Sequence, residues 1–233
     1  MHFGRLPEHT IGDSRAVFLG HFGVGFAAKT AAPRVSLGSL VLAAQFIDLL
    51  WPTFLLLGWE EVRIVPGITT VTPLDFVSYP ITHSLIAVVG WAALVWATYM
   101  FLCRHPRGAI VLAVAVISHW LLDAVVHRPD LPLYPGSPMH VGLGLWSSVG
   151  MTLAVELLTF VIGLWIYLRT TAPRDAVGYW ALWGFVVVLL IIYAVNLLGP
   201  PPPTETALAW TAQSQWLLVV WAYWIDRHRR VVP

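Results

Sequence analysis

The chain has 233 residues, of which 58% are apolar or aromatic and only 11% are charged. Soluble domains carry about 25% charged residues, so a compact soluble fold of this length would lack the polar groups needed to cover its surface. With a net charge of only +1, the composition excludes an ordinary soluble enzyme, a disordered chain and a nucleic-acid-binding protein. The single Cys103 excludes an intramolecular disulfide and a thiolate metal cage. The chain is therefore expected to be an integral membrane protein.

Apolar runs between helix breakers predict the membrane spans, since each span needs about 20 residues. A shorter run, Ser14–Ala31, would either span, with Lys29 extending its amine to the interface, or lie as a re-entrant or interfacial helix. The sequence thus predicts an all-α, polytopic transmembrane helical bundle of six or seven spans, a single integral membrane domain over residues 1–233. The six longer runs are Val35–Trp59, Tyr79–Leu102, Gly108–His127, Leu145–Leu168, Val177–Leu198 and Thr206–Ile225.

Basic residues alternate between the predicted loops. The intervening loops hold only Arg63 and Arg128, and the positive-inside rule then predicts a cytoplasmic C-terminus. The connections Glu60–Ser78 and Arg128–Gly144 are expected to be external. The nine residues of the basic loops are Lys29, Arg34, Arg104, Arg107, Arg169, Arg174, Arg227, Arg229 and Arg230.

Five ionisable side chains fall within the predicted spans, where they are costly and mark functional sites. With a rise of 1.5 Å per helical residue, each lies about 6 to 17 Å from the external end of its span. Four different segments are therefore expected to bring imidazole or carboxylate groups to one layer in the outer half of the membrane. The five residues are His21, Asp48, His83, His119 and Asp123.

Two of these residues, His119 and Asp123, are separated by one helical turn, which places them on one face about 6 Å apart at Cβ. They suit a shared metal ion, or else Asp123 orients one histidine by accepting its N–H. Asp48 precedes Pro52, which is expected to kink the helix, and a carboxylate there requires a metal or a proton. Glu156 is deeper and is expected to be protonated or hydrogen-bonded to neighbouring helices.

The ordered set Gly20-His21, Asp48, Thr82-His83-Ser84 and His119-x-x-Leu-Asp123 resembles the predicted membrane-bound metal-dependent hydrolases, small bacterial inner-membrane proteins. The stretch from His127 to Gly136 resembles one branch of that group. The resemblance covers residues 1–140, the metal-site half, whereas residues 141–233 add spans without a recognised motif. More distantly, the order of ligands is similar to that of zinc-dependent phospholipase C.

The resemblance implies a role for each of these residues. The five buried residues, His21, Asp48, His83, His119 and Asp123, would be metal ligands, with Asp48 also a water-activating base. His127 and His140 would correspond to the later histidines of the zinc-dependent phospholipase C pattern and are therefore catalytic candidates. It is equally consistent with the sequence that both are solvated loop histidines. Gly144 occupies the position of a further acid, which argues against a third ion.

Three imidazoles and two carboxylates suit Zn²⁺ first and Mn²⁺ or Fe²⁺ as alternatives, as one or two ions. We expect a hydrolase in which a metal-activated water attacks a phosphoester or other ester. Its partners would be membrane lipids and a lipid-linked or amphipathic substrate, at the external face of a bacterial inner membrane. The alternatives are a proton- or metal-coupled transporter and a metal-stabilised structural subunit. A transporter would need titratable residues that continue from this site to the cytoplasmic side. Apart from Glu156, the predicted spans contain none there, which favours the enzyme.

Overall fold

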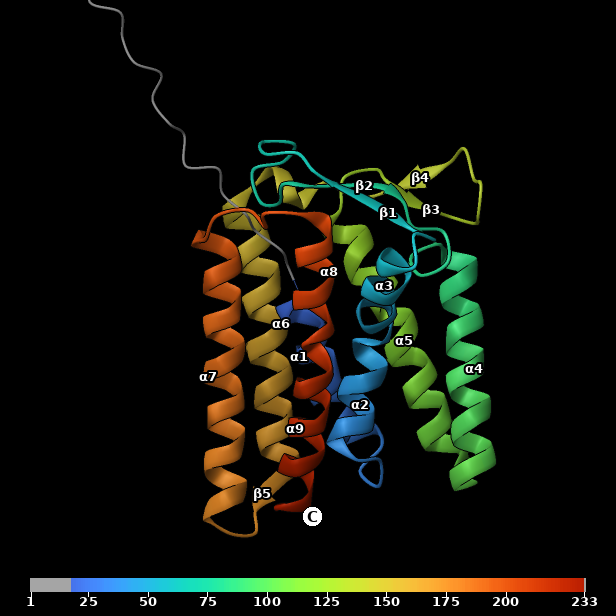
Figure 1. Ribbon diagram of the computed structural model, residues 1–233. Coiled ribbons are helices and arrows are strands. Elements are labelled where there is room, and N and C mark those ends of the chain that lie inside the picture. The colour runs from blue at the N-terminus through green and yellow to red at the C-terminus, as the bar shows by residue number, and fades with distance from the viewer. Residues whose placement is uncertain (1–17, 233) are drawn as a thin grey trace, which may run out of the picture.

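The computed structural model describes residues 18–232, which are mostly helical. Long helices form a bundle whose axes run in roughly one direction, with short antiparallel ribbons at its two ends (Figure 1). The helices are α1 Leu19–Ala31, α2 Leu37–Ala44, α3 Phe46–Leu56, α4 Leu85–Cys103, α5 Pro106–Val126, α6 Val149–Thr170, α7 Ala176–Leu198, α8 Glu205–Gln213 and α9 Gln215–Arg227. The strands are β1 Glu61–Ile64, β2 Leu74–Ser78, β3 Leu131–Pro132, β4 His140–Val141, β5 Thr171–Pro173 and β6 Arg229–Val231.

Four helices within residues 18–232 are long and apolar enough to cross a membrane, and they coincide with predicted spans: α4, α5, α6 and α7. A fifth crossing is formed if α2 and α3, which are bent by 56° at a short break, act together. A mostly helical bundle with several helices apolar enough to cross a membrane is therefore confirmed, but six or seven spans are not. The described part of Ser14–Ala31 is the 13-residue helix α1, and residues 14–17 lie outside the described range.

The predicted span Thr206–Ile225 is divided into α8 and α9. The division falls at Ser214, whose hydroxyl donates to the carbonyl of Thr211 at 2.6 Å. The neighbouring Gln213 donates to Thr53 of α3 at 2.7 Å. Polar side chains that bond to backbone or to other helices compete with regular helical geometry. A hydropathy profile does not include this competition, so it predicts one continuous helix. In the bundle, α8 and α9 follow one another end to end (Figure 1).

The predicted span Val35–Trp59 is broken before it reaches Pro52. Pro52 sits inside α3, which continues to Leu56, although a proline in a helix interior removes one hydrogen bond and its ring crowds the carbonyl four residues earlier. The break falls at Gln45, between α2 and α3. Asp48 consequently lies in the first turn of a new helix, where the helix dipole favours a negative charge.

The helix α1 packs against α6 through two glycines that let the backbones meet. A Cβ added to Gly163 would overlap the carbonyl of Gly23, and one added to Gly23 would lie 2.5 Å from the carbonyl oxygen of Thr159. Small residues at helix crossings allow this close approach in membrane proteins. The close crossing fixes α1, and with it His21, against the bundle.

The two ends of the bundle differ in chemistry. The ribbons β1–β2 and β3–β4 lie at one end, and β5 pairs with β6 at the other (Figure 1). At the β5–β6 end Lys29 is buried rather than extended, and it forms an ion pair of 2.7 Å with Asp226 of α9. Arg107 donates to the carbonyl of Ala31 there at 2.6 Å. The predicted basic loops therefore converge on one end of the protein.

Candidate metal centre

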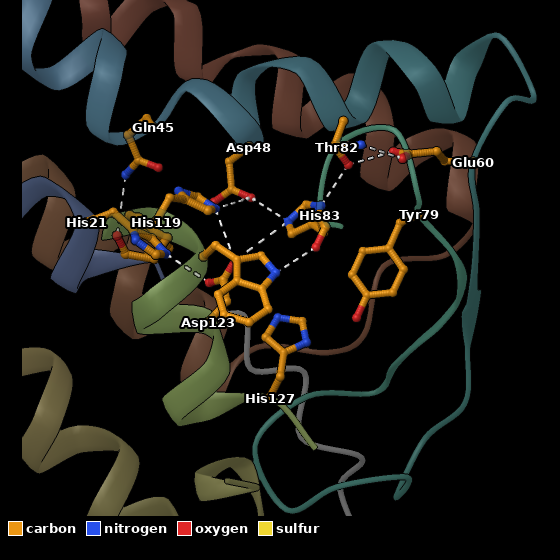
Figure 2. A network of polar contacts seen from close by, with 12 residues as sticks. His21, Gln45, Asp48, Glu60, Tyr79, Thr82, His83, His119, Asp123 and His127 are labelled. Carbon is orange, nitrogen blue, oxygen red and sulfur yellow. Dashed lines mark hydrogen bonds and ion pairs between the residues drawn. The ribbon is translucent and has the colours of Figure 1, made fainter. Parts of the chain in front are cut away.

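The five predicted residues meet in the half of the bundle nearer to β1–β4 (Figure 2). His21 lies in the first turn of α1 and Asp48 in the first turn of α3, while His119 and Asp123 occupy the last two turns of α5. His83 lies in the turn before α4, which begins at Leu85 and not at Tyr79 as the sequence suggests. Four segments that are distant in sequence thus contribute to one cluster.

Four of the ligand atoms form a ring of alternating nitrogen and oxygen. Asp48 Oδ1 lies 3.7 Å from His83 Nε2 and 3.5 Å from His119 Nε2. Asp123 Oδ2 lies 3.8 Å from His83 Nε2 and 3.2 Å from His119 Nε2. Ligands at about 2.0–2.2 Å from a tetrahedral zinc ion are about 3.3–3.6 Å apart, whereas N–H···O hydrogen bonds are about 2.7–3.2 Å long. Only the 3.5 Å separation falls in the tetrahedral range, and the atoms that lie within 4.8 Å of one another form two overlapping groups of three, His83–His119–Asp123 and His21–Asp48–His119.

His21 approaches the ring from its other side. Its Nε2 lies 3.2 Å from Oδ1 of Asp123, and its imidazole stacks on that of His119 with centroids 3.9 Å apart. The two oxygens of Asp123 therefore face different partners, Oδ1 towards His21 and Oδ2 towards the ring. A carboxylate in this position is able to bridge two ions.

The hydrogen bonds of the histidines define where their protons lie. His119 Nδ1 is 3.0 Å from the carbonyl oxygen of Ala44, the last residue of α2, and a carbonyl can only accept. Nδ1 therefore carries the proton, and in the neutral imidazole Nε2 presents a lone pair to the two carboxylates. His119 Nε2 and Asp123 Oδ2 are both buried without a hydrogen-bond partner in the described structure.

The two carboxylates of the cluster also carry negative charge that needs a partner. Within residues 18–232, neither Asp48 nor Asp123 forms an ion pair with a lysine or arginine. Buried charges without partners are strongly destabilising, so these carboxylates require a cation, either a metal or additional protons on the histidines. The Asp48 side chain is 21% exposed, whereas the side chains of the other four are at most 6% exposed. Asp48 is therefore the member of the cluster nearest to an access route.

Behind His83 lie Thr82, which belongs to the motif Thr82-His83-Ser84, and Glu60, to which the sequence alone assigns no role. Thr82 Oγ1 lies 2.7 Å from His83 Nδ1 and 2.7 Å from Oε2 of Glu60 (Figure 2). Glu60 had been grouped with the charges of an external loop, but it is buried. On the other side, Trp120 of α5 donates to the carbonyl of His83 at 2.9 Å. The only sequence signal was the position of Thr82 next to a predicted ligand.

The two catalytic candidates downstream of α5 lie apart from the ring. His127 is buried, and its imidazole is centred 6.5 Å from that of His83. Its Nδ1 lies 3.0 Å from Oδ1 of Asp130, which also accepts from the Tyr79 hydroxyl at 2.9 Å. His140 in β4 is exposed and lines an external cavity of about 300 Å³ together with Tyr79 and Asp130. The structure thus brings His127 near the cluster and leaves His140 at the surface.

Asp130 is held as an anion by its neighbours. Burial alone would raise the pKa of its carboxyl, but hydrogen bonds from His127, Arg128 and Tyr79 outweigh burial and keep the pKa below its usual value. Arg128 also pairs with Asp75 of β2. This network connects the hairpin β1–β2 to the segment after α5 and encloses His127 within it.

Glu156 reaches from α6 to the start of α1. Its Oε2 accepts from the backbone N–H of Gly20 at 2.7 Å, so it satisfies an amide that has no partner within the first turn of a helix. The hydrogen-bonded reading of Glu156 is the one that the structure shows. By fixing the N-terminus of α1, it also fixes the residue next to it, His21.

Comparison of the chain with protein-family models, with curated proteins and with solved structures finds no match.

Proposed function

We propose that the protein is a membrane-embedded hydrolase that depends on a divalent metal and acts on a phosphoester or other ester. The observation that carries this proposal is the ring of acceptors formed by Asp48, His83, His119 and Asp123. Two imidazole lone pairs and two carboxylates face one another at 3.2–3.8 Å, in a buried site without a lysine or arginine partner among the described residues. A divalent cation would neutralise the two carboxylates and accept lone pairs from both the imidazoles and the carboxylates.

The donor set favours Zn²⁺, with Mn²⁺ or Fe²⁺ as alternatives. Zinc takes imidazole and carboxylate ligands in groups of four, whereas calcium prefers cages of six to eight oxygens. His83, His119 and Asp123 would supply three ligands for one ion, and Asp48 lies 3.5–3.7 Å from the two histidines. His21 and the second oxygen of Asp123 supply part of a second site, so the proposal includes one or two ions.

The chemistry follows from these ligands and their setting. When bound, the ion would lower the pKa of a coordinated water towards 7 and stabilise charge on an ester oxygen. Asp48, the most exposed of the five residues, would act as the general base. His127, oriented by Asp130, faces the same region. Because the cluster lies near the ends of apolar helices, the proposed substrate is an ester at the depth of the lipid headgroups.

The motif resemblance supports the same assignment. In the predicted membrane-bound metal-dependent hydrolases, which the ordered motifs resemble, the corresponding residues would bind metal. On this basis we place the protein in a bacterial inner membrane. We also propose that α1, and α8 together with α9, complete the crossings that raise the total from five towards seven.

A hydrolysis screen tests the proposed function. Purified protein in lipid nanodiscs, loaded with zinc or manganese, is incubated with lipid phosphoesters, generic phosphate esters and carboxylic esters. We expect turnover of at least one class, loss of turnover after chelation and recovery after metal is restored. If protein with verified metal occupancy turns over none of these esters, the hydrolase is rejected in favour of a metal-stabilised structural subunit. Metal-dependent proton or ion flux in liposomes without ester turnover would instead indicate a transporter.

The orientation of the protein is tested by cysteine labelling. Because the basic loops converge at the β5–β6 end, the positive-inside rule places this end and the C-terminus in the cytoplasm. Cys103 is exposed, so the test uses a Cys103→Ser background with a single cysteine introduced at Ser78 of β2. We expect an impermeant maleimide to label it from outside the cell. Labelling from the cytoplasmic side alone would reverse the orientation and place the proposed site at the inner face.

A further inference from the structure

The turn that carries His83 is bound by a buried carboxylate from another part of the chain. Glu60 Oε1 accepts from the backbone N–H groups of Ile81 and Thr82, each at 2.8 Å. Its Oε2 accepts from the Thr82 hydroxyl at 2.7 Å. Glu60 is only 4% exposed and Thr82 is fully buried. One side chain thus fixes both the backbone of the turn and the hydroxyl beside His83.

These contacts assign the proton of His83. The oxygens of Glu60 accept three hydrogen bonds, and a hydroxyl has only one proton to donate. The Thr82 hydroxyl donates its only proton to Glu60. In the 2.7 Å contact between Thr82 Oγ1 and His83 Nδ1, the donor must therefore be Nδ1–H. The remaining nitrogen, Nε2, is then a free lone pair directed at Asp48 and Asp123. This is the protonation state that a metal ligand needs.

Glu60 also joins this turn to the helix that carries Asp48. Its backbone N–H donates to the carbonyl of Phe54 at 3.3 Å, and the N–H of Trp59 donates to the same carbonyl at 2.9 Å. Phe54 belongs to α3, which carries Asp48 in its first turn. The distance between two ring members is thereby set through one short connection.

We propose that Glu60 and Thr82 are positioning residues of the metal centre, which hold His83 in its Nδ1–H tautomer and at a fixed distance from Asp48. The inference rests on the proposed metal binding and adds the residues that prepare one ligand for it. Partners of this kind commonly contribute 10–100-fold to metal affinity. Neither Glu60 nor Thr82 contributes an atom to the ring itself.

The sharpest variant is Glu60→Gln, which keeps the size of the side chain and reverses the direction of the one hydrogen bond to the Thr82 hydroxyl. The new amide oxygen still accepts from the two backbone N–H groups, but the amide nitrogen must donate to Thr82 Oγ1. The threonine hydroxyl is then free to donate to His83 Nδ1, and the imidazole proton moves to Nε2, facing the carboxylates. We expect zinc affinity to fall about 10–100-fold. Thr82→Val should have a similar effect, and Thr82→Ser should retain affinity because it keeps the hydroxyl.

The experiment has two readouts and a matched control. Zinc affinity is measured by competition with a chromogenic chelator, and the His83 tautomer is read from ¹⁵N chemical shifts of histidine-labelled, metal-free protein. The control is Glu61→Gln, next in sequence, because Glu61 is exposed and pairs with Arg63 at the surface. Wild-type protein is expected to show His83 protonated at Nδ1, and Glu60→Gln to show it protonated at Nε2 with weakened zinc binding.

The outcomes separate this inference from the metal centre itself. If His83→Ala loses zinc while Glu60→Gln and Thr82→Val bind it as tightly as wild type, the metal centre stands and the positioning role is wrong. If His83→Ala also binds zinc as tightly as wild type, the centre is wrong as well. Should either variant fail to fold, the wild-type tautomer decides, because a neutral His83 that is protonated at Nε2 and not at Nδ1 contradicts the proposal.

Discussion

The Asp123→Asn variant is expected to fold normally and to lose at least about 100-fold in turnover of any ester that the wild-type protein hydrolyses. Asp123 contacts all three histidines of the cluster, since its two oxygens face His21, His83 and His119. Asparagine keeps the shape of the side chain but removes one negative charge and replaces an acceptor with a donor. Metal affinity should therefore fall, and water activation with it. A 100-fold loss corresponds to about 2.7 kcal/mol of transition-state stabilisation.

The matched control for this variant is Asp175→Asn at the opposite end of the bundle. Asp175 caps α7 by accepting from the backbone N–H of Gly178 at 2.8 Å, and asparagine is an equally good N-cap. Its activity should equal that of the wild type. Full activity of Asp123→Asn in a correctly folded, metal-loaded sample would remove Asp123 from the reaction and with it the proposed catalytic centre.

His119→Ala is expected to cause the largest loss of metal. The ligand atom of His119 lies within 4.8 Å of those of His21 and Asp48, and also of those of His83 and Asp123. Removing it opens the ring on two sides, and we expect metal affinity to fall by about 100-fold or more, or about 2.7 kcal/mol. Metal content after dialysis, measured by mass spectrometry, checks this.

Two further variants make the result for His119 interpretable. His119→Gln fills most of the volume that alanine would leave empty, so loss of metal in both variants points to ligation and not to a packing defect. His228→Ala is the control, since His228 lies at the β5–β6 end and bonds to Asp175 at 2.8 Å. Wild-type metal content in both His119 variants would contradict its assignment as a ligand.

The sequence predicted the long helices because their apolar runs exceed the length of a membrane span. It failed where local polar chemistry interrupts such a run. Ser214 and Gln213 divide the last predicted span, and the bend near Asp48 occurs at Gln45 although Pro52 is the obvious breaker. Gln213 bonds to Thr53 of α3, a partner in another helix that hydropathy and helix-breaker rules do not include.

The convergence of the five buried residues was predicted from depth alone. Ionisable groups at a similar depth in several spans have few ways to avoid each other when the helices pack, and the structure brings them together. The environment of His83 could not be predicted in this way. Glu60 lies 23 residues earlier in the sequence, after the end of a different helix. Only the tertiary arrangement of the two turns brings its carboxylate to Thr82.

X-ray absorption spectroscopy of the wild-type protein, purified without chelators and loaded with one equivalent of zinc, tests the central claim most directly. The ring of Asp48, His83, His119 and Asp123 predicts tight, stoichiometric binding. It also predicts a zinc environment of nitrogen and oxygen ligands at about 2.0–2.2 Å, with the outer scattering typical of at least two imidazoles. Absence of stoichiometric binding, or a zinc environment without imidazole scattering, would contradict the assignment of this cluster as a metal centre.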